Sequence, residues 1–214
     1  MAKPRLLIAD DHPLILEGLR RILEPAYEIV AAEIDGRSLV AAAERLRPDL
    51  VLLDIAMPLL NGIEAASQIK QAFPHVGIVV VTQQTDRHYI QAAFRAGVLG
   101  YVIKQSAAAD LLAALRRASV GRFYVSESLR KHVPPGLMAS DTSPEHLFGG
   151  SLTPRQREVL QLVAEGKAAK EIAEILKIST KTVEFHKAGI MDELGLRTTA
   201  ELTRYAIANG IVQA

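Results

Sequence analysis

Three acidic side chains stand at the ends of short apolar segments of the sequence. Asp10 and Asp11 end the segment at residues 5–11, and Asp54 ends the apolar run that begins after Asp49. Short continuous apolar runs are typical of strands buried on both faces of a parallel sheet. Ligands bind at the carboxyl ends of such strands in an open α/β sheet. We therefore expect the three carboxylates to lie together at one edge.

The expected chemistry of this edge is metal binding and phosphoryl transfer. Converging carboxylates repel one another, and a few carboxylates with a backbone carbonyl and waters suit Mg²⁺. Thr82 and Lys104 end two further apolar runs, and their hydroxyl and ammonium groups would hold the oxygens of a phosphoryl group. An aspartate can act as a nucleophile and form an acyl phosphate, which makes Asp54 the candidate acceptor.

Strand and helix patterns alternate through the first part of the chain. Five strand patterns alternating with five helix patterns favour an α/β fold with a five-stranded, doubly wound parallel sheet, in which right-handed crossovers leave few topologies. The expected strands span residues 5–11, 28–32, 50–54, 77–82 and 100–104, and the expected helices span 13–23, 37–46, 63–72, 86–96 and 111–118.

The pattern changes at about residue 121. Pro and Gly clusters at 134–136 and 149–150 indicate a linker over residues 121–148, between a first domain at 4–120 and a second at 149–214. Four helix patterns predict a small all-α second domain at 154–165, 170–176, 180–194 and 199–209. Thr153 before Pro154 is a typical helix start.

Composition excludes several classes of protein. The chain has no cysteine, so disulfides and thiolate metal sites are ruled out, which is compatible with the cytoplasm. No apolar run approaches the roughly 20 residues needed to span a bilayer, and no signal peptide is expected. Residues 151–214 contain nine Lys/Arg and eight Asp/Glu. DNA binding must therefore depend on where the charges lie.

Residues 5–120 resemble the receiver domain of two-component response regulators, a flavodoxin-like fold. The matching pieces are Ala9–Pro13, the run from Asp54 through Met57-Pro58 to Gly62, Thr82, and Gly97–Lys104. The resemblance implies that Asp54 is the phosphoacceptor and that Asp10, Asp11, Asp54 and the backbone carbonyl of Ala56 hold Mg²⁺. It also implies that Thr82 and Lys104 bind the phosphoryl group, and that Tyr101 turns inward when Thr82 moves.

Two positions leave the lifetime of the phosphoryl group open. A small Ala56 leaves room for an attacking water, whereas Gln84 would either orient or block that water. Taken singly, each residue of the acidic site also has an ordinary structural role, such as a helix cap for Asp10 and Asp11.

The second domain resembles the LuxR-type helix-turn-helix. The matching pieces are Leu152–Leu160, Glu165-Gly-Lys167, Glu171-Ile-Ala173 and Lys181–Lys187. The helix at 180–194 would then enter the major groove. Phosphate contacts are expected from Lys181, Thr182, His186 and Lys187, and base contacts from Glu184, Phe185 and Ala188. Glu184 could accept a hydrogen bond from cytosine and Phe185 could contact a thymine methyl group, whereas helix packing is the alternative for Phe185 and His186.

Together the two halves resemble a NarL/FixJ-type response regulator. The resemblance implies a cytoplasmic transcription regulator, not an enzyme beyond its own phosphotransfer and dephosphorylation. A histidine kinase would phosphorylate Asp54, and phosphorylation would control homodimerisation and binding of double-stranded DNA, with RNA polymerase a further candidate partner and no membrane association. One alternative is a phosphorylation-independent DNA-binding protein with the receiver as a scaffold. The other is an aspartate-nucleophile phosphohydrolase, although Ala56 replaces the second Asp that haloacid-dehalogenase-type enzymes carry.

Overall fold

The computed structural model describes residues 2–106, 108–133 and 152–212 of the chain. The chain divides into two compact units, Met1–Phe148 and Gly149–Ala214. Each unit has hydrophobic clusters of its own.

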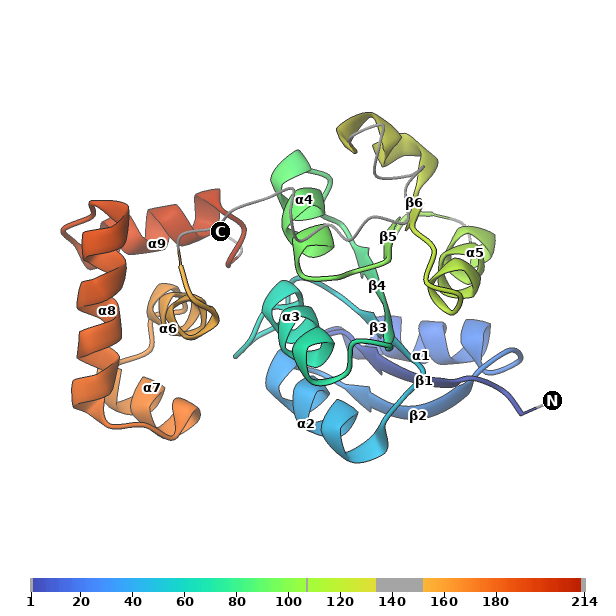
Figure 1. Cartoon of the computed structure of the whole chain (residues 1–214), viewed down its shortest axis with the longest axis horizontal. Coiled ribbons are helices and arrows are strands. Elements are labelled where there is room, and N and C mark those ends of the chain that lie inside the picture. The colour runs from blue at the N-terminus through green and yellow to red at the C-terminus, as the bar shows by residue number, and fades with distance from the viewer. Residues whose placement is uncertain (1, 107, 134–151, 213–214) are drawn as a thin grey trace. The chain divides into compact units, whose positions relative to one another are not determined.

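The first unit contains a parallel sheet in the order β2-β1-β3-β4-β5-β6 (Figure 1). The central strands are wholly buried, as expected for a sheet covered on both faces. The strands are β1 (Arg5–Ala9), β2 (Glu28–Glu33), β3 (Leu50–Leu53), β4 (Gly77–Thr82), β5 (Gly100–Ile103) and β6 (Tyr124–Val125). The order reverses between β1 and β3, which places the switch point of the sheet beside Asp10 and Asp54.

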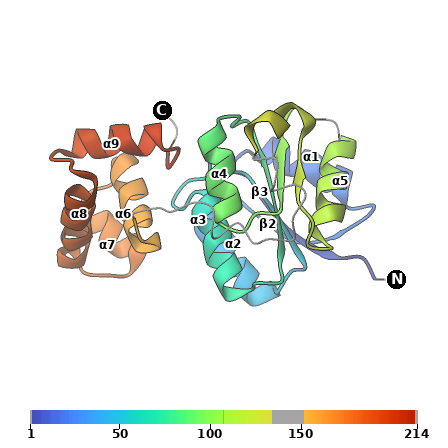
Figure 2. The same ribbon diagram turned by 45° about the horizontal axis from the view of Figure 1, so that its top comes forward.

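Five helices cover the two faces of this sheet. They are α1 (Pro13–Leu23), α2 (Gly36–Leu46), α3 (Gly62–Ala72), α4 (Arg87–Arg95) and α5 (Ala108–Ala118). Helices α2, α3 and α4 lie on one face, and α1 and α5 lie on the other (Figure 2). The sheet therefore has a hydrophobic core on each face. Because side chains alternate along a strand, Leu7 of β1 packs in the core on the α2–α4 side and Leu6 packs in the core on the α1 and α5 side.

The sixth strand was not predicted. Tyr124–Val125 pairs in parallel with Gly100 and Tyr101 of β5, and a 3₁₀ helix, η1 (Glu127–His132), follows it. Val125, Leu129 and Val133 are buried in the core on the α2–α4 side. The prediction of a linker from residue 121 is therefore wrong over residues 124–133, because a two-residue strand has no readable period and gains its stability from pairing with β5. The predicted linker residues 134–148 lie outside the described residues.

The described residues of the second unit, 152–212, form four helices, as predicted. They are α6 (Pro154–Ala164), α7 (Ala169–Leu176), α8 (Thr180–Leu194) and α9 (Thr199–Ala208). Their apolar faces meet in one core that includes Leu160, Ile172, Val183 and Leu202. Within the described ranges, none of the helices combines the length and the apolar character that crossing a bilayer would require.

Local hydrogen bonds define where these helices begin. Thr153 and Gln156 form a reciprocal capping box at α6, in which Pro154 takes the first helical position. The Ser179 hydroxyl accepts a hydrogen bond from the Thr182 amide at 3.0 Å and caps α8. Arg155 of α6 donates to the Leu176 carbonyl at 2.8 Å, which ties the end of α7 to α6. The turn between α7 and α8 is thus held from both sides.

Candidate functional site

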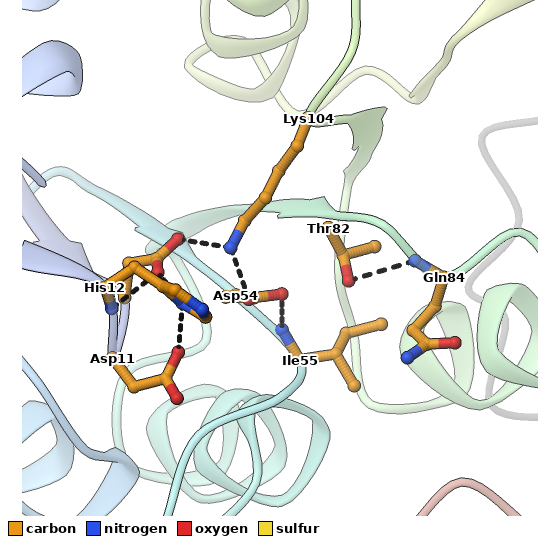
Figure 3. A network of polar contacts seen from close by, with 8 residues as sticks. Asp11, His12, Asp54, Ile55, Thr82, Gln84 and Lys104 are labelled. Atoms are coloured by element: carbon orange, nitrogen blue, oxygen red, sulfur yellow. Dashed lines mark hydrogen bonds and ion pairs between the residues drawn. The ribbon is translucent and has the colours of Figure 1, made fainter. Parts of the chain in front are cut away.

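The predicted site residues meet at one edge of the sheet. Asp10 and Asp11 follow β1, Asp54 follows β3, Thr82 ends β4 and Lys104 follows β5. All five positions lie at the carboxyl ends of neighbouring parallel strands, so the sheet brings together residues that are up to 94 positions apart (Figure 3). Asp10, Asp54 and Thr82 are buried, whereas Asp11 is exposed.

Lys104 bridges two of the carboxylates. Its Nζ lies 2.6 Å from Oδ2 of Asp54 and 2.7 Å from Oδ2 of Asp10, and its side chain is only 8% exposed. Burial alone would lower the pKa of Lys104, but the hydrogen bonds and negative charges of Asp10 and Asp54 outweigh it and raise the pKa. The ammonium is therefore held in its charged form, as a partner for negative oxygen at Asp54.

His12 joins the acidic residues, and we did not predict this role for it. Its Nδ1 lies 2.7 Å from Oδ1 of Asp11 and 3.1 Å from Oδ1 of Asp10 (Figure 3). Asp10, Asp11, His12 and Asp54 each offer a ligand atom, and these atoms lie within 4.8 Å of one another. We call these four residues the acidic cluster. The signal in the sequence was the position of His12 directly after two acids.

The donor atoms of the acidic cluster fit a divalent cation. Two buried carboxylates and one exposed carboxylate supply the hard oxygen atoms that Mg²⁺ prefers. The side-chain carboxylates account for this fit. The contribution of the Ala56 carbonyl stays a prediction.

The backbone around Asp54 is closely packed. The Asp54 amide donates to the Ala9 carbonyl at 3.0 Å, and Oδ1 of Asp54 accepts from the Ile55 amide at 2.6 Å. A Cβ atom on Gly62 would lie 2.0 Å from the Asp54 carbonyl oxygen, so only glycine allows α3 to begin this close to Asp54. The backbone of Asp54 is thus tied to β1, and its side chain is oriented by the Ile55 amide and by Lys104.

Tyr101 points into the protein. Its side chain is fully buried, and its hydroxyl donates to the Gln84 carbonyl at 3.0 Å. Burial and, next, the charge of Asp54 raise the pKa of Tyr101 well above its ordinary value, so the hydroxyl remains a donor. Thr82 Oγ1 accepts from the Gln84 amide at 3.3 Å. One loop residue, Gln84, thereby contacts both predicted switch residues.

A second group of predicted residues lies along α8. Lys181, Glu184, Phe185 and Ala188 are exposed and follow helical spacing on one face. Phe185 is 75% exposed, and its ring lies edge to face with the ring of the neighbouring His186, with the ring centroids 5.9 Å apart. Thr182, His186 and Lys187 are half-buried, and the Thr182 hydroxyl lies 2.8 Å from Ser179 within the cap. The open face of α8 therefore combines one cation, one anion and an exposed aromatic ring.

Comparisons with known proteins match both units. Residues 6–116 match the model of the response regulator receiver domain, and residues 150–206 match that of bacterial regulatory proteins of the luxR family. The transcriptional regulatory protein MctR of Rhizobium johnstonii is 33% identical over 98% of this chain and 96% of its own length. The oxygen regulatory protein NreC of Staphylococcus aureus is 34% identical over 98% of this chain and 99% of its own length.

Solved structures of the response regulator RcsB are also similar. One from Salmonella typhimurium has a TM-score of 0.64 at 30% identity and covers 98% of this chain and 99% of its own. The RcsB–DNA complex has a TM-score of 0.58 at 30% identity and covers 97% of this chain and 98% of its own.

The chain belongs to the two-component response regulators, as its parallel receiver fold and acidic cluster suggested. Within them it joins a receiver domain to a LuxR-type helix-turn-helix, the combination found in DNA-binding transcription regulators.

Proposed function

We propose that this response regulator is switched by phosphorylation of Asp54, with residues 4–120 as the receiver and residues 149–214 as the DNA-binding domain. The observation that carries the proposal is the position of Asp54, which is buried within the acidic cluster. It lies beside the ammonium of Lys104, whose raised pKa keeps it charged. The phosphodonor is a histidine kinase, and the regulator acts in the cytoplasm, where bacterial DNA lies.

The chemistry follows from the groups around Asp54. A carboxylate oxygen of Asp54 attacks the phosphorus of a phosphohistidine; the new O–P bond forms as the P–N bond breaks, and the imidazole leaves with the electron pair and takes up a proton. Asp10, Asp11, Asp54 and the Ala56 carbonyl hold Mg²⁺, which when bound neutralises the charge of the carboxylates and of the phosphoryl oxygens. Lys104 pairs with one phosphoryl oxygen, and Thr82 donates its hydroxyl to another.

The response then reaches the DNA-binding domain. Movement of Thr82 shifts the Gln84 segment, to which the Tyr101 hydroxyl is hydrogen-bonded. The Thr82 loop and Tyr101 together form the two-state element. The phosphorylated protein dimerises and places α8 in the major groove, with Lys181, Thr182, His186 and Lys187 near phosphates and Glu184, Phe185 and Ala188 near bases. Beyond transfer and loss of its own phosphoryl group, the protein catalyses no reaction.

Intact-mass measurement tests the phosphorylation. The protein is incubated with Mg²⁺ and acetyl phosphate, then sized and tested for binding to DNA selected from a random pool. We expect a phosphate adduct in the wild type and in Asp49→Asn, and none in Asp54→Ala. Asp49 is the matched control, because it lies before β3 and accepts from the Arg5 amide at 2.7 Å.

The adduct should accompany dimerisation and tighter DNA binding. Equal DNA binding in the wild type and Asp54→Ala, with no adduct in either, would instead indicate a receiver that serves as a scaffold.

A further inference from the structure

Ser126 is a buried polar residue that stands between β6 and η1, beside the end of β5 (Figure 1). It is only 2% exposed. Its backbone amide donates to the Tyr101 carbonyl at 3.0 Å, which extends the pairing of β6 with β5 by one residue. A hydroxyl buried in this way needs hydrogen-bond partners, because an unpaired polar group in the interior costs free energy.

The hydroxyl of Ser126 uses all of its hydrogen-bonding capacity. A serine hydroxyl has one proton to donate and two lone pairs to accept. The proton goes to Oδ2 of Asp110 in α5, at 2.6 Å. The oxygen accepts from the Ile103 amide at 3.4 Å and lies 3.3 Å from the Ser106 hydroxyl oxygen. Because the single proton of Ser126 points to Asp110, Ser106 is the donor in the last contact.

These contacts lie on both sides of Lys104 in the chain. Ile103 directly precedes Lys104, and Ser106 follows it by two residues. On the other side of β5, the Lys104 amide donates to the Thr82 carbonyl at 2.9 Å. The backbone that carries the Lys104 side chain is therefore held by β4 on one side and by Ser126 on the other.

We propose that Ser126 is a positioning residue for phosphotransfer, whose hydroxyl, oriented by Asp110, holds the end of β5 so that the Lys104 ammonium meets Asp54. The inference rests on the proposed function, in which this ammonium pairs with a phosphoryl oxygen. The Lys104 Nζ lies 2.6 Å from Asp54 and 2.7 Å from Asp10, so a small shift of its backbone would lengthen both contacts (Figure 3). Ser126 thus acts through Lys104 and not on the phosphoryl group.

Two measurements on the full chain test Ser126→Ala. The first is the rate of phosphorylation by acetyl phosphate with Mg²⁺, followed by intact mass. The second is the side-chain ammonium resonance of Lys104 in ¹H–¹⁵N NMR spectra, assigned by its loss in Lys104→Arg. Ser128→Ala is the matched control, because it makes the same change at an exposed position of η1. Thermal unfolding followed by circular dichroism verifies that each variant is folded.

We expect the phosphorylation rate to fall about tenfold in Ser126→Ala. A misplacement of about 1 Å can cost roughly 100-fold, and the loss of one hydroxyl should move Lys104 by less than that. The ammonium resonance of Lys104 should shift in Ser126→Ala and stay in place in Ser128→Ala. A hydroxyl with a merely structural role would lower stability without moving this resonance.

Ser106→Ala replaces the test variant if Ser126→Ala does not fold. Ser106 is half-buried, and its loss removes the donor on the far side of Lys104. The same two changes are expected to a smaller extent, and the absence of both would overturn the proposal.

The role of Ser126 and the proposed function fail in different ways. An unchanged rate in folded Ser126→Ala, or a slower rate with the Lys104 resonance in place, would overturn the positioning role while the wild type still forms the adduct. A wild type that forms no adduct would refute the proposed function itself, whatever the resonance of Lys104 does.

Discussion

At the scale of single residues, Lys104 compensates two buried acids at once. Removing one partner of a buried ion pair leaves an uncompensated charge and typically costs 3–5 kcal/mol. Lys104 contacts both Asp10 and Asp54, and its side chain is only 8% exposed. We expect Lys104→Met to lower the free energy of unfolding by about 3 kcal/mol at pH 7, measured by urea denaturation. The double variant Lys104→Met/Asp54→Asn should recover at least about 1 kcal/mol, because one carboxylate has lost its charge.

The same ion pairs predict a pH dependence. The pKa of Lys104 is raised in the folded protein, so its contribution to stability is fully present below the ordinary lysine pKa of about 10.5 and is lost as the pH rises through the folded-state value. The difference in free energy of unfolding between the wild type and Lys104→Met should stay constant from pH 7 to 10 and should shrink only above that range. A difference that had already closed at pH 9 would contradict the raised pKa.

Leu59 has a backbone conformation that leucine rarely adopts. Its φ is +64°, and the Leu60 amide donates to the Pro58 carbonyl at 2.7 Å, which closes a three-residue turn around it. A left-handed residue with a Cβ costs about 1–2 kcal/mol, and Asn tolerates this region better. We expect Leu59→Asn to raise the free energy of unfolding by about 1 kcal/mol in urea. Leu59→Val should lower it, since a β-branched residue fits the turn less well.

At the scale of elements, β6 and η1 are part of the first unit and not merely a connection. Leu129 of η1 is 2% exposed in the core that also contains Tyr101 and Phe94. Replacing a buried leucine by alanine typically costs 2–5 kcal/mol. Leu129→Ala should therefore destabilise the first unit by about 3 kcal/mol, measured by denaturation. Ser128→Ala, at an exposed position of the same helix, should change it by less than about 0.5 kcal/mol.

Two glycines of the second unit separate helix propensity from backbone strain. A Cβ on Gly189 of α8 would meet the side-chain nitrogen Nε2 of Gln156, at 3.5 Å. A Cβ on Gly166 would meet nothing within 4 Å. Gly166 has a φ of +80°, which favours glycine. We expect Gly189→Ala to stabilise the second unit by about 1 kcal/mol and Gly166→Ala to destabilise it by about 1 kcal/mol. Calorimetry of the full chain gives both signs, and stabilisation by both changes would rule out the backbone argument.

At the scale of the whole molecule, the charge of the second unit limits its attraction to DNA. Residues 151–214 carry nine Lys/Arg and eight Asp/Glu, so the affinity must come from the few cations near α8. Each phosphate contact contributes about −0.9 to the slope of log K against log salt concentration. Lys181→Ala should make the slope shallower by about 0.9 per subunit, measured by fluorescence anisotropy. Glu184→Ala should not make it shallower, because Glu184 binds no phosphate.

The sequence by itself determined the alternation of strands and helices and the four helices of the second unit. It also determined that Asp10, Asp11, Asp54, Thr82 and Lys104 stand at strand ends. These features depend on local patterns: apolar runs, caps such as Thr153 and glycine stops. The family followed from the same motifs. The sequence could not reveal β6, because two residues show no period until β5 pairs with them.

Only the tertiary structure decided which of these side chains touch. The two ion pairs of Lys104 join segments that are far apart in the chain. The contacts of His12 with both acids and of Gly62 with Asp54 depend on sharp turns within one segment. The open face of α8 was likewise settled by packing, which buries Val183 and Ile190 and leaves Phe185 in solvent. The reason is physical: strand and helix patterns follow from neighbouring residues, whereas side-chain contacts at a site depend on how the whole sheet twists and packs.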